Sequence, residues 1–250
     1  MTQTYENRRF DSVAEVYRFL SQLLQSQLHK ALKMGKHFSV ALSGGNTPRE
    51  FLHFAARVIE KDLLSNAAFF QVDERFVPPL HPESNRNMIE QAFVQTAGIS
   101  KWFPINTECA NPLTASASYN RVLATSPYLN RDEAGRPVFD LILLGIGSDG
   151  HTASLFPGTS AESISDKYAI CVSPSGKSER ISLSYQVLIA ASCLIFLVTG
   201  KDKREIMNEL FHTSNPMPAR SVIEHSHRSI IVYDADADPM NTSNCKEGNL

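Results

Sequence analysis

Short apolar runs alternate along this chain with longer stretches in which apolar residues recur every three or four positions. The runs are short enough to be buried strands, and the longer stretches are typical of helices with one buried face. Strands that alternate with helices predict a Rossmann-like α/β fold, an open, mostly parallel sheet with right-handed crossovers and helices on both faces. The expected strands cover residues 37–42, 67–72, 138–144, 193–198 and 229–233.

Capping residues and prolines predict where several helices begin. Asp11 is a candidate N-cap for a helix that continues to about Met34. Asn46 or Thr47 is a suitable cap just before Pro48, which fits the first position of a helix. The remaining expected elements are a helix capped by Ser84 or Asn85, helices over 115–129, 206–211 and 221–224, and two short strands over 168–173 and 180–184 with a turn at Ser175–Gly176.

Composition indicates a globular protein and limits its partners. The 250 residues are 42% hydrophobic and 20% charged, and they contain no repeat or long linker, so we expect one domain over 1–250 with a frayed polar tail over 234–250. A net charge of -2 argues against nucleic-acid and membrane partners, because such proteins usually carry a basic face. A local basic cluster for a small anion remains compatible with that charge.

The chain has neither a signal-like N-terminus nor an apolar run of membrane-spanning length, so we expect a cytoplasmic location. Its four cysteines form no CxxC pair and have no zinc-site spacing.

Polar loops follow four of the expected strands. In an open parallel sheet, the carboxyl ends of the strands converge on one crevice, where ligands bind. We therefore expect residues that are distant in sequence to form a single site there. The loops are SGGNTP (43–48), VDER (72–75), GIGSDGH (145–151) and TGKDK (199–203).

The first of these loops has the features of a phosphate site. Small hydroxyls, glycines and a helix start place free N–H groups and a positive dipole end together. The loop lacks the GK[ST] of a nucleotide P-loop and the spacing of GxGxxG. A tight turn with a helix cap explains the same residues equally well. The residues concerned are Ser43, Gly44, Gly45, Asn46 and Thr47.

Charged residues follow the other strands. Lys203 and Arg180 fit a phosphate monoester beside that loop, although basic residues at helix starts are commonly only solvated. Asp73 and Arg75 share one side of an extended chain. They either pair with each other or hold substrate hydroxyls.

His151 is the strongest catalytic candidate. It lies in a loop between glycines, an unusual place for a buried structural histidine, and Asp149 is close enough to tune it as a general base. The chain has no GxSxG nucleophile elbow, which favours activated water over a covalent intermediate. No second histidine or acid stands at metal-ligand spacing.

The motifs ALSGGNTP, VDERFVP, LLGIGSDGHTASLFPG, RISLS and VTGKDKRE occur in the order found in 6-phosphogluconolactonases, and the chain resembles this family over nearly its full length. The family belongs to the glucosamine/galactosamine-6-phosphate isomerase superfamily. The resemblance implies the glucosamine-6-phosphate deaminase-like fold and hydrolysis of 6-phosphogluconolactone in the oxidative pentose phosphate pathway. It implies no cofactor and no metal, and it leaves a monomer or a homodimer open.

The resemblance also implies roles for individual residues. His151 is the expected general base, with Asp149 supporting it. Arg180, Lys203 and the 43–47 loop are expected to bind the phosphate, and Asp73 and Arg75 to order the sugar.

Phe156 and Pro157 stand where the deaminase-like pattern has an acidic residue before a proline, which disfavours the related deaminase and isomerase activity. A non-catalytic sugar-phosphate sensor is the other alternative, and the presence of His151 favours an enzyme.

Overall fold

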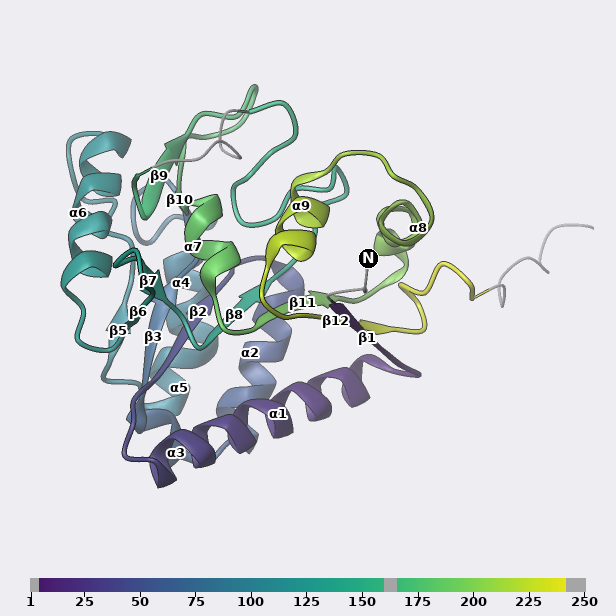
Figure 1. The fold of residues 1–250 in the computed structure, drawn as a ribbon, viewed down its shortest axis with the longest axis horizontal. Helices are drawn as coiled ribbons and strands as arrows, with labels where there is room; N and C mark the ends of the chain where they lie inside the picture. The colour runs from purple at the N-terminus through teal and green to yellow at the C-terminus, as the bar shows by residue number, and fades with distance from the viewer. Residues whose placement is uncertain (1–4, 160–165, 242–250) are drawn as a thin grey trace, which may run out of the picture.

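The apolar runs form the centre of one sheet (Figure 1). The computed structural model describes residues 5–159 and 166–241. Within them, the sheet contains β1 (Tyr5–Phe10), β2 (Phe38–Leu42), β3 (Ala67–Gln71), β5 (Trp102–Phe103), β8 (Leu141–Leu144), β11 (Leu194–Val198) and β12 (Ser229–Asp234). The strand order is β1-β12-β11-β8-β2-β3-β5, and each neighbouring pair is parallel. The predicted Rossmann-like α/β fold is therefore confirmed.

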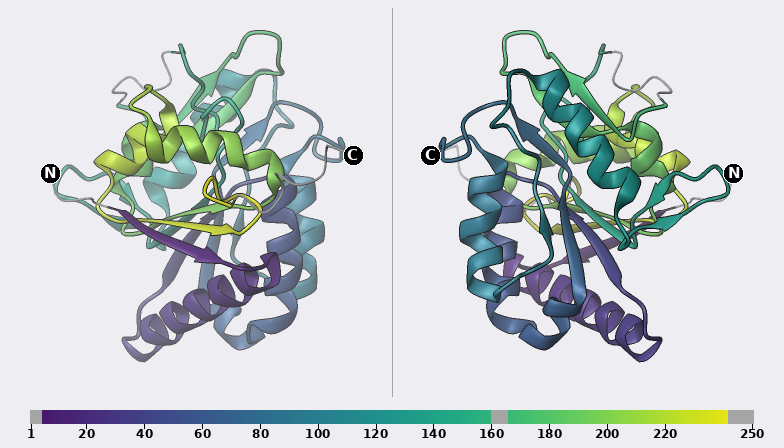
Figure 2. Two further views of the ribbon diagram at one scale, coloured as in Figure 1. Left: turned by 90° about the vertical axis from the view of Figure 1, so that its right-hand side faces the viewer. Right: turned by 90° about the vertical axis from the view of Figure 1, so that its left-hand side faces the viewer.

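Helices cover both faces of this sheet because the inner strands are apolar on both sides (Figure 2). On β2, Val40 and Leu42 join one buried cluster, whereas Ala41 joins the other. The first cluster is covered by α1 (Val13–Lys33), α2 (Asn46–Val58), α3 (Lys61–Asn66), and α4 (Asn85–Ile89) with its π-helical continuation (Glu90–Val94) and α5 (Gln95–Ala97). The second is covered by α6 (Pro112–Thr125), α7 (Tyr185–Ala190), α8 (Arg204–His212) and α9 (Pro218–His225).

Two predicted helix caps are wrong by one residue. Ser12, not Asp11, caps α1, and its hydroxyl accepts a hydrogen bond from Glu15 N at 3.3 Å. Gly45, and neither Asn46 nor Thr47, precedes α2. It has φ +105°, a conformation that glycine adopts readily, so the helix begins immediately after it.

Of two further predicted helices, one begins as expected and the other has different ends because capping residues and a proline determine them. Ser84 caps α4, as predicted, by accepting from Asn87 N at 3.2 Å. Helix α6 covers Pro112–Thr125 instead of 115–129. Asn111 caps its start, and Pro127 disfavours helical backbone at the residue before it.

The two short strands after residue 166 belong to a separate antiparallel sheet and not to the parallel one. This sheet has the order β4-β10-β9, with β4 (Asp73–Arg75), β10 (Arg180–Leu183) and β9 (Ala169–Val172). Their predicted turn is present, with Gly176 at φ +70°. Strands β6 (Asn130–Arg131) and β7 (Pro137–Val138) form a two-stranded ribbon, so only the second half of the predicted 138–144 strand lies in the main sheet.

Residues 234–241 are not frayed, contrary to the prediction for the tail. Asp234 ends β12 and accepts from Gly200 N at 3.0 Å, while Asp238 receives Arg9 Nε at 2.7 Å. These carboxylates are buried against partners distant in sequence, which polarity alone does not reveal. The rest of the predicted tail, 242–250, lies outside the described residues. No helix in the described ranges has the length and apolar character needed to cross a membrane.

Candidate active site

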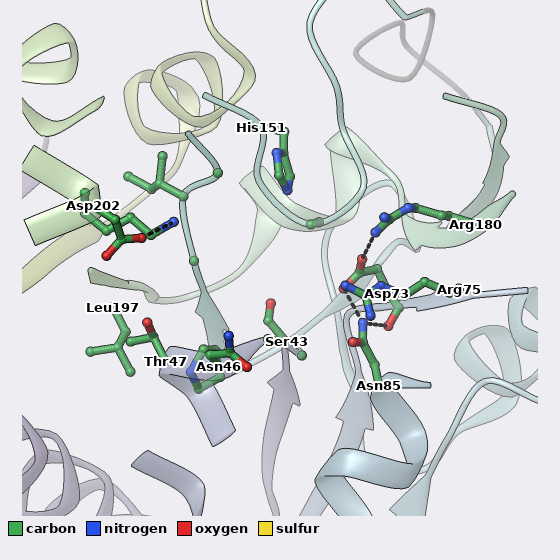
Figure 3. Close-up of a pocket in the computed structure, with 18 residues that line it drawn as sticks. Ser43, Asn46, Thr47, Asp73, Arg75, Asn85, His151, Arg180, Leu197 and Asp202 are labelled. Carbon is green, nitrogen blue, oxygen red and sulfur yellow. Dashed lines mark hydrogen bonds and ion pairs between the residues drawn. The ribbon is translucent and has the colours of Figure 1, made fainter. Parts of the chain in front are cut away.

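A cavity of about 260 Å³ lies where the loops after β2, β8 and β11 meet β4 and β10 (Figure 3). Each residue predicted for the site lines this cavity except Asp149. Asp149 contacts the imidazole of His151, which does line the cavity. Strands that follow one another in the sheet thus bring residues from four distant loops together, as the sequence predicted.

The loop after β2 leaves backbone N–H groups free at the start of α2. Because Gly45 precedes the helix without a side-chain cap, the N–H groups of Asn46 and Thr47 point away from the helix body without an intrahelical acceptor. Ser43 is buried, and its hydroxyl has no hydrogen-bond partner among the described residues. Gly44 is required here for space, since a Cβ would lie 1.9 Å from Asn85 Oδ1.

Three basic side chains line the same cavity. Lys203 lies in a 3₁₀ turn after β11 (Lys201–Lys203), with Nζ 3.8 Å from the exposed Asp202 carboxylate. Arg75 donates to Glu83 O at 2.6 Å. The Nε groups of Arg75 and Arg180 are buried and have no partner in the part of the chain that the structure describes. Buried donors without a protein partner are uncommon, and here two of them belong to side chains that line the cavity.

Arg180 lies on the Asp73 side of the cavity, opposite the Thr47 and Asp202 side (Figure 3). Its Nη1 is 4.0 Å from Asp73 Oδ2. Burial lowers the pKa of Arg180 and the Asp73 charge opposes that change, so the guanidinium remains a partly desolvated cation.

Asp73 is buried and is held from two further directions. Ser154 Oγ donates to its Oδ2 at 2.6 Å, and Asn85 Nδ2 lies 3.4 Å from its Oδ1. The predicted pairing of Asp73 with Arg75 is therefore wrong, because the cation beside Asp73 is Arg180. Asp73 and Arg75 both line the cavity, so their role in holding substrate hydroxyls stays a prediction.

Glu74 lies beneath the site and fixes the loop before α4. Its carboxylate accepts from the backbone N–H groups of Arg75, Asn85 and Arg86 at 2.7–2.8 Å, and from the side chains of Ser84 and Gln71. Burial raises the pKa of Glu74 above its ordinary value, while these hydrogen bonds oppose the rise. The sequence analysis did not identify this residue.

His151 and Asp149 form a hydrogen-bonded pair at the other side of the cavity. Asp149 Oδ1 contacts both His151 Nδ1 and His151 N. With Nδ1–H donated to the carboxylate, Nε2 carries the free lone pair, the state needed in a general base. Burial raises the pKa of Asp149, but its hydrogen bonds with His151 and the charges of His151 and Lys177 outweigh that effect and hold the pKa below its ordinary value.

Phe156 forms the floor beneath this pair. It is buried, and its ring centroid lies 4.6 Å from that of His151. Lys177 Nζ lies 4.5 Å from the same ring and 3.6 Å from Asp149 Oδ2, while Arg180 approaches the ring at 5.2 Å. The Phe156 ring therefore contacts the histidine and lies beside two cations, where a carboxylate would instead pair with those cations.

Sequence reasoning missed Asn85, Ser154 and Lys177 as parts of the site. Asn85 was expected only at a helix start, Ser154 lies in the histidine-loop motif without an assigned role, and Lys177 lies in none of the motifs. Among the residues that the structure describes, no group of three or more His, Cys, Asp or Glu side chains is arranged to hold a metal ion.

The crevice of this α/β sheet combines free helix-start N–H groups, three partly buried cations and a carboxylate-supported histidine, a set of groups suited to an enzyme with an anionic substrate. Comparison with known proteins gives the family. The chain belongs to the glucosamine-6-phosphate isomerase/6-phosphogluconolactonase family, whose family model matches residues 11–232. The resemblance identified from the motifs is thereby confirmed.

The individual relatives are lactonases. The chain is 35% identical over 206 residues to 6-phosphogluconolactonase of Nostoc sp., covering 82% of this chain and 83% of that protein. It is 35% identical over 189 residues to 6-phosphogluconolactonase of Synechocystis sp., covering 74% and 76% of the two chains. The solved structure of 6-phosphogluconolactonase from Trypanosoma brucei matches with a TM-score of 0.83 at 25% identity, over 94% of this chain and 98% of that one.

Proposed function

We propose that this chain is a 6-phosphogluconolactonase, a hydrolase that converts 6-phospho-D-glucono-1,5-lactone to 6-phospho-D-gluconate within the oxidative pentose phosphate pathway. The observation that carries the proposal is the carboxylate-supported His151 in the same cavity as an anion-binding helix start. The similar proteins of Nostoc sp. and Synechocystis sp., which are 6-phosphogluconolactonases, support the choice of substrate.

Binding begins at the phosphate. The 43–47 loop and Lys203 receive the phosphate oxygens, with Arg180 as a further cation in the same cavity. Asp73 and Arg75 order the hydroxyls of the sugar ring. These contacts fix the lactone carbonyl near His151.

The chemical step is histidine-assisted attack by water. His151 Nε2 removes a proton from water, and the water oxygen bonds to the lactone carbonyl carbon. Arg75 or neighbouring backbone N–H groups stabilise the oxyanion, an effect of about 2.7–4 kcal/mol for a well-placed donor. The bond from the carbonyl carbon to the ring oxygen then breaks, and His151 returns its proton to that oxygen.

The role of His151 as general base can be tested by removing its imidazole. We expect His151→Ala to lower kcat by roughly 10²–10⁴-fold, the usual contribution of general acid–base catalysis, with the fold intact because the side chain is partly exposed. The measurement is hydrolysis of freshly generated 6-phosphogluconolactone, corrected for the spontaneous rate. His227→Ala is the matched control, since His227 is exposed and outside the cavity.

Near-wild-type turnover by the His151 variant would contradict the mechanism. Ammonia release from glucosamine 6-phosphate would show the related deaminase activity, and tight binding of 6-phosphogluconate by a wild-type chain without turnover would show a sensor.

A further inference from the structure

A buried hydroxyl joins the loop that carries His151 to the carboxylate across the cavity. Ser154 is fully buried, and its Oγ donates to Asp73 Oδ2 at 2.6 Å. Its backbone N–H donates to Ser182 Oγ at 3.2 Å, and Ser182 is the register partner of Asp73 in the antiparallel sheet. Ser154 therefore contacts two neighbouring strands of that sheet.

The turn that delivers Ser154 has an unusual backbone. Ala153 has φ +50°, and among the described residues it is the one non-glycine with a positive φ. Hydrogen bonds on either side hold it there: Thr152 Oγ1 donates to Gly145 O, and Leu155 N donates to Thr152 O, both at 2.9 Å. Left-handed backbone at a non-glycine residue persists only where the surroundings enforce it. This turn sets the direction of Ser154 relative to His151, three residues earlier.

The two oxygens of Asp73 have different surroundings. Oδ2 accepts the short bond from Ser154 and faces Arg180 Nη1 at 4.0 Å. Oδ1 has only the long 3.4 Å contact with Asn85. Since an ionised carboxylate can accept about four hydrogen bonds, Oδ1 retains capacity for a ligand hydroxyl.

We propose that Ser154 is a positioning residue for the sugar hydroxyls, acting through Asp73. Its hydrogen bond to Oδ2 fixes the rotation of the carboxylate, so that Oδ2 stays beside Arg180 and Oδ1 keeps capacity to accept from a ligand hydroxyl. Because the same turn carries His151, Ser154 also fixes the spacing between the general base and the group that orders the sugar. This inference rests on the proposed function for the identity of the ligand.

The test compares the binding of 6-phosphogluconate, measured by calorimetry, with lactone turnover. We expect Ser154→Ala to weaken binding of 6-phosphogluconate and raise KM for the lactone by about tenfold, the effect of losing a hydrogen bond to a charged group, with a much smaller change in kcat. Ser184→Ala is the matched control. Ser184 is also buried, but its hydroxyl has no partner among the described residues, so its loss should change binding less than about twofold.

A double-mutant cycle separates positioning from general packing. In an Asp73→Asn background, Ser154→Ala should add little, because the two side chains act as one unit. Equal affinity of wild type and Ser154→Ala, or an undiminished Ser154 effect in the Asp73→Asn background, would overturn the proposal. If Ser154→Ala does not fold, Ser154→Cys keeps the volume with a weaker donor and should give an intermediate loss.

The two proposals fail in different ways. Weakened binding in Ser154→Ala together with a wild-type chain that hydrolyses no lactone would support the role of Ser154 and contradict the lactonase. Normal turnover by wild type with unchanged binding in Ser154→Ala would do the opposite.

Discussion

Two glycines of the histidine loop have different structural roles despite their similar surroundings in sequence. A Cβ at Gly147 would lie 2.0 Å from His151 Nδ1 and 2.7 Å from Asp149 Oδ1, whereas a Cβ at Gly145 would have no atom within 4 Å. Neither residue has the left-handed backbone that restricts Gly150. Position 147 therefore requires glycine because the His151 and Asp149 side chains lie against its Cα, and not because of its backbone conformation.

We expect Gly147→Ala to lower kcat at least about tenfold, since the new methyl must displace the imidazole from its carboxylate. Gly145→Ala is the comparison, because its methyl contacts no protein atom. Gly145 lines the cavity, so the methyl can raise KM, but we expect kcat within about twofold of wild type. Steady-state lactone kinetics on both variants check this. Equal kcat values for the two would show that the position of the His151 ring does not matter for turnover.

Contacts in the site could be predicted from the sequence where the two residues are close together along the chain. Asp149 and His151 are two residues apart, so their pairing could be expected from sequence. Ser154 and Asp73 are 81 positions apart, one in the turn after His151 and the other on β4, and no local pattern connects them. Asp73 and Arg75 line the same cavity, as expected, but the cation beside Asp73 is Arg180, because β4 and β10 are antiparallel neighbours.

At the scale of elements, β4 and α4 are joined by one side chain. Glu74 on β4 accepts backbone N–H groups on both sides of the Pro-rich loop, including Asn85 and Arg86 at the start of α4. This arrangement places Asn85 against both Gly44 and Asp73. The position of the helix start is therefore part of the shape of the site.

We expect Glu74→Ala to destabilise the protein by about 1–3 kcal/mol, since it leaves buried donors without an acceptor. Glu133→Ala removes an exposed carboxylate and should change the free energy of unfolding by less than about 0.5 kcal/mol. Urea denaturation of both variants gives the comparison. Equal stability of the Glu74 variant and wild type would mean that water or neighbouring groups satisfy these donors.

Periodicity predicted elements better than it predicted their pairing. Buried strands such as β11 were recognisable because a parallel strand covered on both faces is a continuous apolar run. Strand β1 was missed because its sequence, YENRRF, is polar and lies at the sheet edge with one neighbour. The short helix α7 was missed because six residues show too little periodicity.

At the scale of the molecule, both buried clusters share the same strands, and we propose that the described residues fold as a single domain. Alternate residues of β2, β8, β11 and β12 enter opposite clusters, so neither cluster can unfold without exposing the other. We expect one unfolding transition in urea, with coincident curves from far-ultraviolet circular dichroism, from lactonase activity and from the fluorescence of Trp102. Trp102 is the single tryptophan and lies at the β5 edge, so an earlier fluorescence transition would indicate a separate unit there.

The parallel pairing of β1 with β12 has a consequence for how the chain assembles. Arg9 and its partner Asp238 are 229 positions apart, so this contact closes a very long loop, and such contacts form slowly. Until β1 docks, β12 presents a row of unpaired backbone groups, which other chains can extend into an intermolecular sheet. The charges of β1, at Glu6, Arg8 and Arg9, then cover that edge with residues unsuited to further pairing. We therefore expect the N-terminal strand to dock late in folding and to protect the β12 edge against self-association.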